Sequence, residues 1–213
     1  MASKITPKRP STAVFDFGGV LVDWNPRHLY RKLIADPAEM ERFLAEVTTR
    51  EWHQVQDHGG DTVAATRRLQ ALHPDKEELI AAFYERFDEM NEKVFPDMVA
   101  LVERLHAAGT PLYLLSNAPD ILDPWLRGPA RRTHPFLGRF RDYVVSGLVK
   151  CSKPDAAIYE LACRTGGFHP GDAVFIDDVL ANVEGARAVG MHAIYHRSAN
   201  QTAAELRALG LPA

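Results

Sequence analysis

The chain has 213 residues, of which 46% are hydrophobic and 25% charged, proportions that are typical of a globular protein. Its 25 basic and 28 acidic residues give a net charge of −3, so it lacks the basic surplus of a dedicated nucleic-acid binder. It contains no run of about 18 apolar residues, so we expect no membrane-spanning helix. No apolar run follows the basic N-terminus, so we expect no secretory signal and predict a disordered tail over residues 1–11.

The two cysteines show no spacing that is typical of a metal site or a redox motif. Cys163 falls in an apolar helical pattern, where we expect a buried structural role, and Cys151 has no base beside it in the sequence. Two cysteines cannot form a disulfide framework. We therefore expect a reducing, cytoplasmic location.

Five short apolar runs predict buried strands. They are residues 13–16, 111–117, 143–146, 173–178 and 192–196. Continuous runs of Val, Ile, Leu and Phe suit strands that are covered on both faces of a parallel sheet. Helical patterns lie between the later runs, for example at residues 98–108 and 155–165, and glycines close them. This alternation predicts a doubly wound, Rossmann-like α/β core.

The stretch between the first and second strands has no convincing strand of its own. We predict helices in it near residues 27–34, 38–47, 61–72 and 75–91. An all-helical block inserted at this point should form a separate cap. The predicted organisation is therefore an α/β core of residues 12–22 and 96–213, with an inserted helical cap of residues 23–95.

Polar residues end the predicted strands, and ligands of open α/β sheets bind beyond the carboxyl ends of the strands. These residues are Asp16, Ser116, Asn117, Asp177 and Asp178, with Lys153 in the loop after the third strand. Clustered carboxylates raise each other's pKa, and a divalent cation relieves the repulsion. Oxygen ligands without Cys or His favour Mg²⁺ over zinc. The sequence therefore predicts a magnesium site at this edge.

Four segments, in order and each at a strand end, resemble the motifs of the haloacid dehalogenase superfamily. They are FDFGGVLVD (15–23), LSN (115–117), SKP (152–154) with IY (158–159), and FIDD (175–178) with Asn182. The resemblance covers about residues 12–196. It is closest to the phosphatase branch with a helical C1 cap, and within it to the α-D-glucose-1-phosphate phosphatase-like group, which shares the Asp-x-Gly opening and the Asp-Asp-x-x-x-Asn ending.

The resemblance implies a Mg²⁺-dependent phosphatase that hydrolyses a small phosphorylated metabolite, such as a hexose 1-phosphate, through an aspartyl-phosphate. Asp16 would be the nucleophile. The Asp16 carboxylate, the backbone carbonyl of Gly18 and Asp178 would hold Mg²⁺. Asp177 would orient water at the metal, and Asn182 would hold that loop.

The same resemblance assigns the phosphate-binding groups. Ser116, the backbone of Asn117 and Lys153 would bind the phosphoryl oxygens, where charge accumulates in the transition state. Lys153 would also offset the negative charge of the carboxylates. Pro154 follows it and starts a helix, as in the family pattern, which favours Lys153 over Lys150 for this role.

One position departs from the family pattern. Most phosphatases of the superfamily place a second Asp two residues after the nucleophile, where it protonates the leaving oxygen, but residue 18 here is glycine. A sugar 1-phosphate would tolerate this loss, because its anomeric leaving oxygen is less basic than an alkyl alkoxide. Asp23, Arg27 and His28, at the junction with the cap, are candidates for supplying a proton or gripping the substrate. The segment 51–59 falls where caps of the family often present side chains to substrate.

The sequence leaves two alternative functions open. A metal-independent 2-haloacid dehalogenase would use the same Asp16 to displace halide from carbon, although it needs no carboxylate pair such as Asp177 and Asp178. A binding or regulatory protein that kept the fold and lost turnover is the second alternative, and Gly18 is its main support. The phosphatase interpretation is favoured because Asp16, Lys153 and Asp178 are all present.

Overall fold

The computed structural model describes residues 9–213, and its centre is a five-stranded parallel sheet. The strands lie in the order β3-β2-β1-β4-β5. They are β1 (Thr12–Phe15), β2 (Leu112–Ser116), β3 (Asp142–Val145), β4 (Ala173–Asp177) and β5 (His192–Tyr195). All five predicted strands are present, which confirms the doubly wound, Rossmann-like core.

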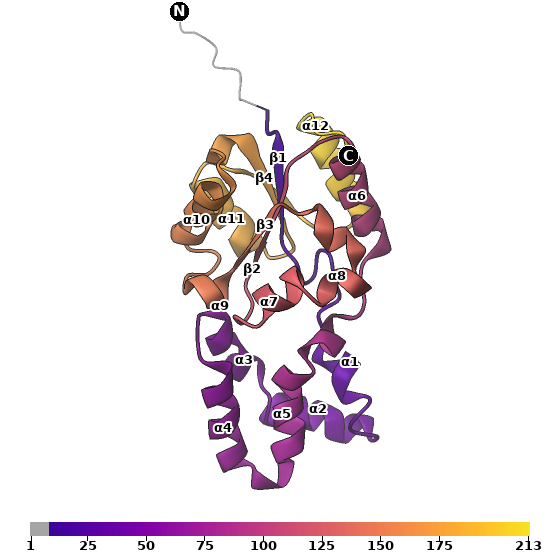
Figure 1. Cartoon of the computed structure of the whole chain (residues 1–213), viewed down its shortest axis with the longest axis vertical. Helices are drawn as coiled ribbons and strands as arrows, with labels where there is room; N and C mark the ends of the chain where they lie inside the picture. Colours follow the sequence, from indigo (N-terminus) through magenta and orange to yellow (C-terminus); the bar gives the residue numbers. More distant parts are fainter. Residues whose placement is uncertain (1–8) are drawn as a thin grey trace, which may run out of the picture.

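Helices cover both faces of this sheet (Figure 1). On one face, α10 (Ala156–Gly166) and α11 (Leu180–Ala188) enclose an apolar cluster around Val14, Leu115 and Phe175. Cys163 is buried in this cluster, as predicted. On the other face, α6 (Pro96–Ala107) and α12 (Ala199–Ala208) pack on a larger cluster that continues into the inserted helices.

Short helical segments fill the connections around β3 and before β4. They are α7 (Leu122–Arg127), α8 (Ala130–Thr133), η3 (Pro135–Arg139), α9 (Ser146–Val149) and η4 (Pro170–Asp172). Each spans one or two turns, and helices this short form only with support from tertiary packing. Their hydrophobic periodicity is correspondingly too short to be detected in the sequence.

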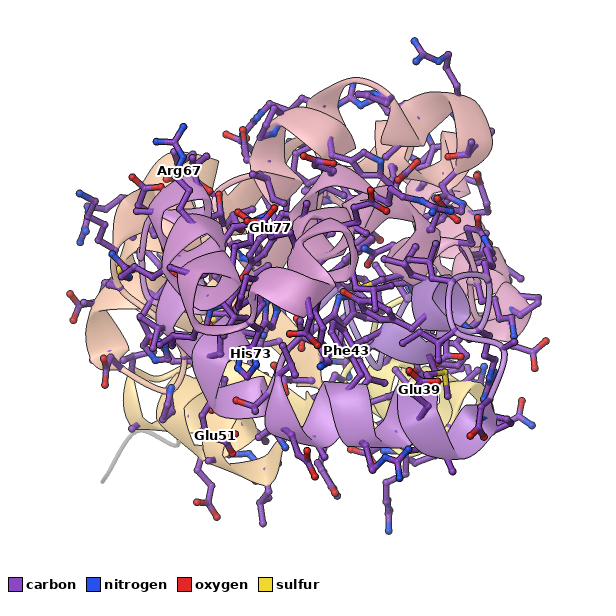
Figure 2. The ribbon with its side chains drawn as sticks, turned by 90° about the horizontal axis from the view of Figure 1, so that it is seen from below. Glu39, Phe43, Glu51, Arg67, His73 and Glu77 are labelled. Carbon is purple, nitrogen blue, oxygen red and sulfur yellow. The ribbon has the colours of Figure 1, made fainter. Side chains whose placement is uncertain are left out.

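The chain between β1 and α6 is helical and lies at the carboxyl ends of the strands (Figure 1). It contains α1 (Pro26–Tyr30), α2 (Pro37–Glu46), α3 (Arg50–Asp57), α4 (Thr62–Leu72), η1 (Pro74–Lys76), α5 (Glu77–Glu85) and η2 (Phe87–Asn91). We propose to treat residues 23–95 as a cap on the α/β core, and use the word in this sense below. In Figure 2, which views the end of the cap away from the sheet, Glu39, Glu51 and Arg67 are exposed, whereas Phe43 is buried.

The cap differs from its sequence-based prediction in two places. The helix predicted over residues 75–91 is interrupted, because Arg86 leaves the helical region at φ −119° and ψ 34°. The helix α3 is not predicted at all, because its two buried side chains, His53 and Gln56, are both polar. The apolar periodicity that indicates a helix is therefore missing from α3.

The two connections between core and cap run side by side. The backbone N–H of Asp23 donates to the carbonyl of Lys93 at 2.8 Å, and that of Phe95 donates to the carbonyl of Leu21 at 2.9 Å. Of the predicted tail, residues 1–8 lie outside the described residues, while Ser11 donates its N–H to the carbonyl of Asp172 at 2.8 Å. Within residues 9–213, no helix has both the length and the apolar content needed to cross a membrane.

Candidate active site

Three carboxylates meet where β1 and β4 end. Asp16 directly follows β1, Asp177 is the last residue of β4, and Asp178 comes next. Each offers an oxygen, and these oxygens lie within 4.8 Å of one another. A cavity of about 490 Å³ opens at this edge, and its wall includes Asp16, Gly18, Ser116, Asn117, Lys153, Asp178 and Asn182.

Lys153 is the buried cation of this cluster. Its Nζ lies 2.8 Å from Asp16 Oδ1 and 2.7 Å from Asp177 Oδ2, and it donates to the carbonyl of Leu115 at 3.1 Å. Burial alone would lower the pKa of the ammonium, yet the two carboxylates together hold that pKa above its ordinary value. Lys153 therefore stays charged between the two carboxylates.

The Asp177 carboxylate is fully buried, and both of its oxygens accept hydrogen bonds from other groups of the protein. Its Oδ1 accepts from the backbone N–H of Val179 at 2.7 Å and from Asn182 Nδ2 at 3.1 Å. Its Oδ2 accepts from Lys153 at 2.7 Å and from Asn182 at 3.0 Å. With both oxygens engaged, Asp177 supports Lys153 and the loop after β4. The role expected for Asp177 in orienting water at a metal stays a prediction.

The Asp16 carboxylate is oriented by two donors on the same oxygen. Besides Lys153, the backbone N–H of Phe17 donates to Oδ1 at 2.7 Å. Burial, together with the charge of Asp177, raises the pKa of Asp16 to about 8 against the opposing effect of Lys153. A second cation beside Asp16 would therefore favour its carboxylate form.

Asp178 lies closer to solvent, over Gly19. A Cβ at Gly19 would be 2.3 Å from Asp178 Oδ2, and the residue has a left-handed φ of +76°. Only glycine combines that backbone conformation with room for the carboxylate. Partial burial raises the pKa of Asp178, and Asp177 adds to this effect. Asp178 and Asp16 thus face the same space with oxygen donors.

Asn117 fixes the loop that carries Lys153. Its side chain donates to the carbonyl of Lys153 at 2.9 Å and accepts from the N–H of Lys153 at 2.9 Å. This double contact was not foreseen from the sequence, because it depends on how two loops from different strands meet. It leaves the Asn117 backbone and the Ser116 hydroxyl as the groups available to a phosphoryl oxygen on this side.

The cap supplies the opposite wall of the cavity. Its lining residues are Trp24, Arg50, His53, Gln54, Asp57, His58, Phe87 and Asn91. Four of these, His53, Gln54, Asp57 and His58, lie within the segment 51–59 that was expected to face the substrate. The other four carry no motif.

Three residues predicted to supply a proton or grip the substrate lie outside the cavity wall. Asp23 Oδ2 and His28 Nε2 are 2.8 Å apart, and Arg27 binds Glu41 with Nε at 2.6 Å from Oε1. None of the three is part of the cavity wall. The structure therefore does not bring Asp23, Arg27 or His28 to the carboxylate cluster, because they pair with each other and with α2.

Fold and site together define a hydrolase-type α/β protein with an acidic centre at the strand ends. A family model described as haloacid dehalogenase-like hydrolase matches residues 10–190. The chain therefore belongs to the haloacid dehalogenase-like hydrolase family.

Relatives and solved structures agree with this assignment. A sesquiterpene phosphatase of Aspergillus oryzae is 28% identical, over 92% of this chain and 95% of its own. A phosphoglycolate phosphatase of Xylella fastidiosa is 26% identical, over 85% of this chain and 78% of its own. Among solved structures, a magnesium complex of a family enzyme from Bacteroides thetaiotaomicron has a TM-score of 0.67 at 19% identity, covering 89% of this chain and 94% of its own. The structure of a dehalogenase in an intermediate complex has a TM-score of 0.66 at 18% identity, and the match covers 93% of this chain and 97% of the dehalogenase chain.

Proposed function

We propose that this protein is a Mg²⁺-dependent phosphatase that hydrolyses a small phosphorylated metabolite through an aspartyl-phosphate on Asp16. The observation that carries the proposal is the buried Lys153, whose Nζ lies 2.8 Å from Asp16 and 2.7 Å from Asp177. A fixed ammonium beside a carboxylate nucleophile reduces the repulsion that an anionic phosphate would meet. The phosphatase names of the two relatives support the same chemistry.

The donor set fits magnesium. Asp16, Asp178 and the Gly18 carbonyl would hold the ion, because they offer only oxygen, and Gly19 makes room for the Asp178 carboxylate. Asp177 is excluded from direct binding by the four contacts that its oxygens already make. When bound, the ion supplies positive charge against the phosphoryl oxygens and the nucleophile. The magnesium complex of the structural neighbour is consistent with this assignment.

The residues of the chain account for both chemical steps. The Phe17 N–H and Lys153 hold the Asp16 carboxylate in one orientation for in-line attack on phosphorus. Lys153, the Ser116 hydroxyl and the Asn117 backbone N–H bind the phosphoryl oxygens as the bond to the leaving oxygen breaks. Water then attacks the same phosphorus, and Asp16 is restored.

The cap side of the cavity favours a hydroxylated leaving group, such as a sugar. Asn91 lines the cavity, and its Oδ1 is buried without a hydrogen-bond partner among the described residues. A hydroxyl of the substrate would satisfy such an acceptor, whereas a hydrocarbon chain would leave it unpaired. This argument supports a sugar phosphate such as a hexose 1-phosphate.

The test is a phosphate-release screen of sugar 1-phosphates and 6-phosphates, with farnesyl phosphate and phosphoglycolate as comparisons. We expect release with Mg²⁺, loss of release with EDTA, and no turnover by the Asp16→Asn variant. Halide release from 2-chloropropionate that survives EDTA would overturn the proposal in favour of a dehalogenase. Stoichiometric trapping of phosphate without turnover would favour a binding protein.

A further inference from the structure

A carboxyl group of the cap lines the same cavity as Asp16 and takes no part in the functions assigned so far. Asp57 is the last residue of α3, and its side chain is only 14% exposed. Its Oδ1 lies 3.4 Å from His53 Nε2 but makes no hydrogen bond within the described part of the chain. A buried carboxyl that lacks a partner carries a large penalty as an anion, so it favours the protonated form.

The groups around Asp57 do not supply the charge that would ionise it. Burial raises the pKa of Asp57 to about 7, and Arg50 and His58 lower it by less than burial raises it. Burial also lowers the pKa of His53 to about 4, so the imidazole beside Asp57 is neutral near pH 7. His53 is held in place by Tyr84, whose hydroxyl lies 3.1 Å from Nδ1, and by Trp24, which stacks on it at 5.1 Å.

Residue 18, where the family's acid is missing, lies beside this same group of side chains. A Cβ placed on Gly18 would lie 3.5 Å from Trp24 Cβ. Trp24 carries the stacked His53, and His53 contacts Asp57. Gly18, Trp24, His53 and Asp57 all belong to the cavity wall.

The end of α3 is fixed to the core loops that bind phosphate. The Ser146 hydroxyl donates to the backbone carbonyl of Asp57 at 2.5 Å and accepts from the N–H of Ala118 at 3.0 Å. Ser146 is fully buried, and Ala118 directly follows Asn117. The position of Asp57 is therefore tied to the loop that carries Ser116 and Asn117.

We propose that Asp57 is the acid that protonates the leaving oxygen of the substrate, in place of the side chain that Gly18 lacks. The inference rests on the proposed phosphatase function. As Asp16 bonds to phosphorus and the bond from phosphorus to the leaving oxygen breaks, the Asp57 carboxyl gives its proton to that oxygen. In the second step, the Asp57 carboxylate takes a proton from the attacking water. The bond from phosphorus to Asp16 then breaks, and inorganic phosphate leaves.

The test compares an alkyl phosphate with 4-nitrophenyl phosphate in the Asp57→Asn variant, in the presence of Mg²⁺. The alkyl alkoxide needs a proton in order to leave, whereas the nitrophenolate does not. We expect kcat/KM for the alkyl phosphate to fall by about 10²–10⁴-fold, the usual value of general acid help. With 4-nitrophenyl phosphate we expect a burst of one nitrophenolate per active site, followed by slow turnover, because hydrolysis of the aspartyl-phosphate loses its base.

The matched control is Asp61→Asn, which removes one carboxylate from the same cap. Asp61 is the exposed residue that precedes α4, and its side chain accepts a hydrogen bond from the backbone N–H of Ala64. It is not part of the cavity wall, and an asparagine at this position preserves the hydrogen bond. We expect its activity on both substrates to match that of the unmodified protein. A second variant, Asp57→Asn with Gly18→Asp, should recover much of the alkyl phosphate activity, because it places an acid at residue 18.

The outcomes separate the inference from the function on which it rests. An Asp57→Asn variant that is unchanged on both substrates, or that loses equal activity on both without a burst, would overturn the role of Asp57 and leave the phosphatase proposal standing. If Asp57→Asn fails to fold, the unmodified protein decides: kcat/KM for the alkyl phosphate should fall as the pH rises through about 7 while kcat/KM for 4-nitrophenyl phosphate holds, and coincident pH profiles for the two substrates would overturn the inference. An unmodified protein that releases no phosphate with Mg²⁺ would overturn both.

Discussion

Lys153 Nζ lies 2.7 Å from Asp177 Oδ2, and this ion pair has almost no access to solvent. Because Asp16 contacts the same ammonium, one cation offsets two buried carboxylates. Removing one partner of a buried charge cluster leaves the others uncompensated, which is far more destabilising than the loss of a surface ion pair. Lys153 therefore supports the structure of the site, in addition to the phosphate-binding role proposed above.

We predict that Lys153→Met lowers the free energy of unfolding by about 3 kcal/mol, measured by urea denaturation with EDTA present. Lys153 lowers the pKa of Asp16, so its loss moves that pKa further up. A carboxyl with a raised pKa in the folded state destabilises that state increasingly as pH rises, so the deficit should grow toward alkaline pH.

The control for this variant is Lys32→Met. Lys32 forms exposed ion pairs with Glu89 and Glu92 at 2.8 and 3.0 Å. We expect it to lose far less stability than Lys153→Met, because exposed ion pairs contribute little. Equal losses in the two variants would show that the buried cluster contributes nothing beyond an ordinary surface pair.

A second prediction concerns Gly19, where a Cβ would overlap the Asp178 carboxylate. We expect Gly19→Ala to require a much higher Mg²⁺ concentration for half-maximal phosphate release, because Asp178 must move away from the ion. The positive φ adds a stability loss of about 1–2 kcal/mol. A magnesium titration of the activity measures the effect.

Gly109→Ala separates backbone strain from displacement of Asp178. Gly109 has a similar φ of +82°, but a Cβ there would meet nothing within 4 Å. Its variant should show the loss of stability and keep the magnesium dependence of the unmodified protein. A Gly19→Ala variant with unchanged magnesium dependence would argue against Asp178 as a ligand.

The sequence allowed the core and the carboxylate cluster to be predicted, because both follow from local patterns. Buried parallel strands are continuous apolar runs, and the residues that end them meet at one edge, so Asp16 and Asp177 could be placed together before any coordinates. The cap wall could not be predicted in this way. The helix α3 buries His53 and Gln56, so its pattern lacks apolar periodicity.

The chemistry of Asp57 shows the same limit. The sequence around residue 57 does not indicate a raised pKa, because the shift comes from burial of the Asp57 side chain in the folded protein. The contact of Ser146 with the Asp57 carbonyl spans 89 positions of the chain. Such effects depend on packing between distant segments, whereas the predicted site residues lie at strand ends.

A third prediction tests the missing acid directly. In the Asp57→Asn background, we expect Gly18→Asp to raise the rate of alkyl phosphate hydrolysis, because the side chain has room beside Trp24 and can protonate the leaving oxygen. Gly18→Asn is the matched control, since it adds a side chain of equal size without an acid, and it should give no gain. If Gly18→Asp raises the rate at no pH, acid supply does not limit this enzyme.

The last prediction concerns the pH dependence of stability, in which His53 and Asp57 have opposite effects. Burial lowers the pKa of His53 from 6.5 to about 4, so between these values the unfolded state binds the extra proton and stability rises with pH. Burial raises the pKa of Asp57 from 3.8 to about 7, so the folded state binds the extra proton and stability falls with pH. Each effect amounts to about 1.4 kcal/mol per pH unit, and between pH 4 and 6.5 the two cancel.

Single variants should reveal each half of this balance in urea denaturation across the same pH range. Relative to the unmodified protein, Asp57→Asn leaves the His53 contribution unopposed, so this variant should lose stability as the pH falls. Relative to the same reference, His53→Gln leaves the Asp57 contribution unopposed, so this variant should gain stability as the pH falls. Arg50 and His58, which act on Asp57, and Tyr84, which faces His53, remain in place in both variants. Changes of slope with the same sign in the two variants, each measured against the unmodified protein, would contradict a protonated Asp57 beside a neutral His53.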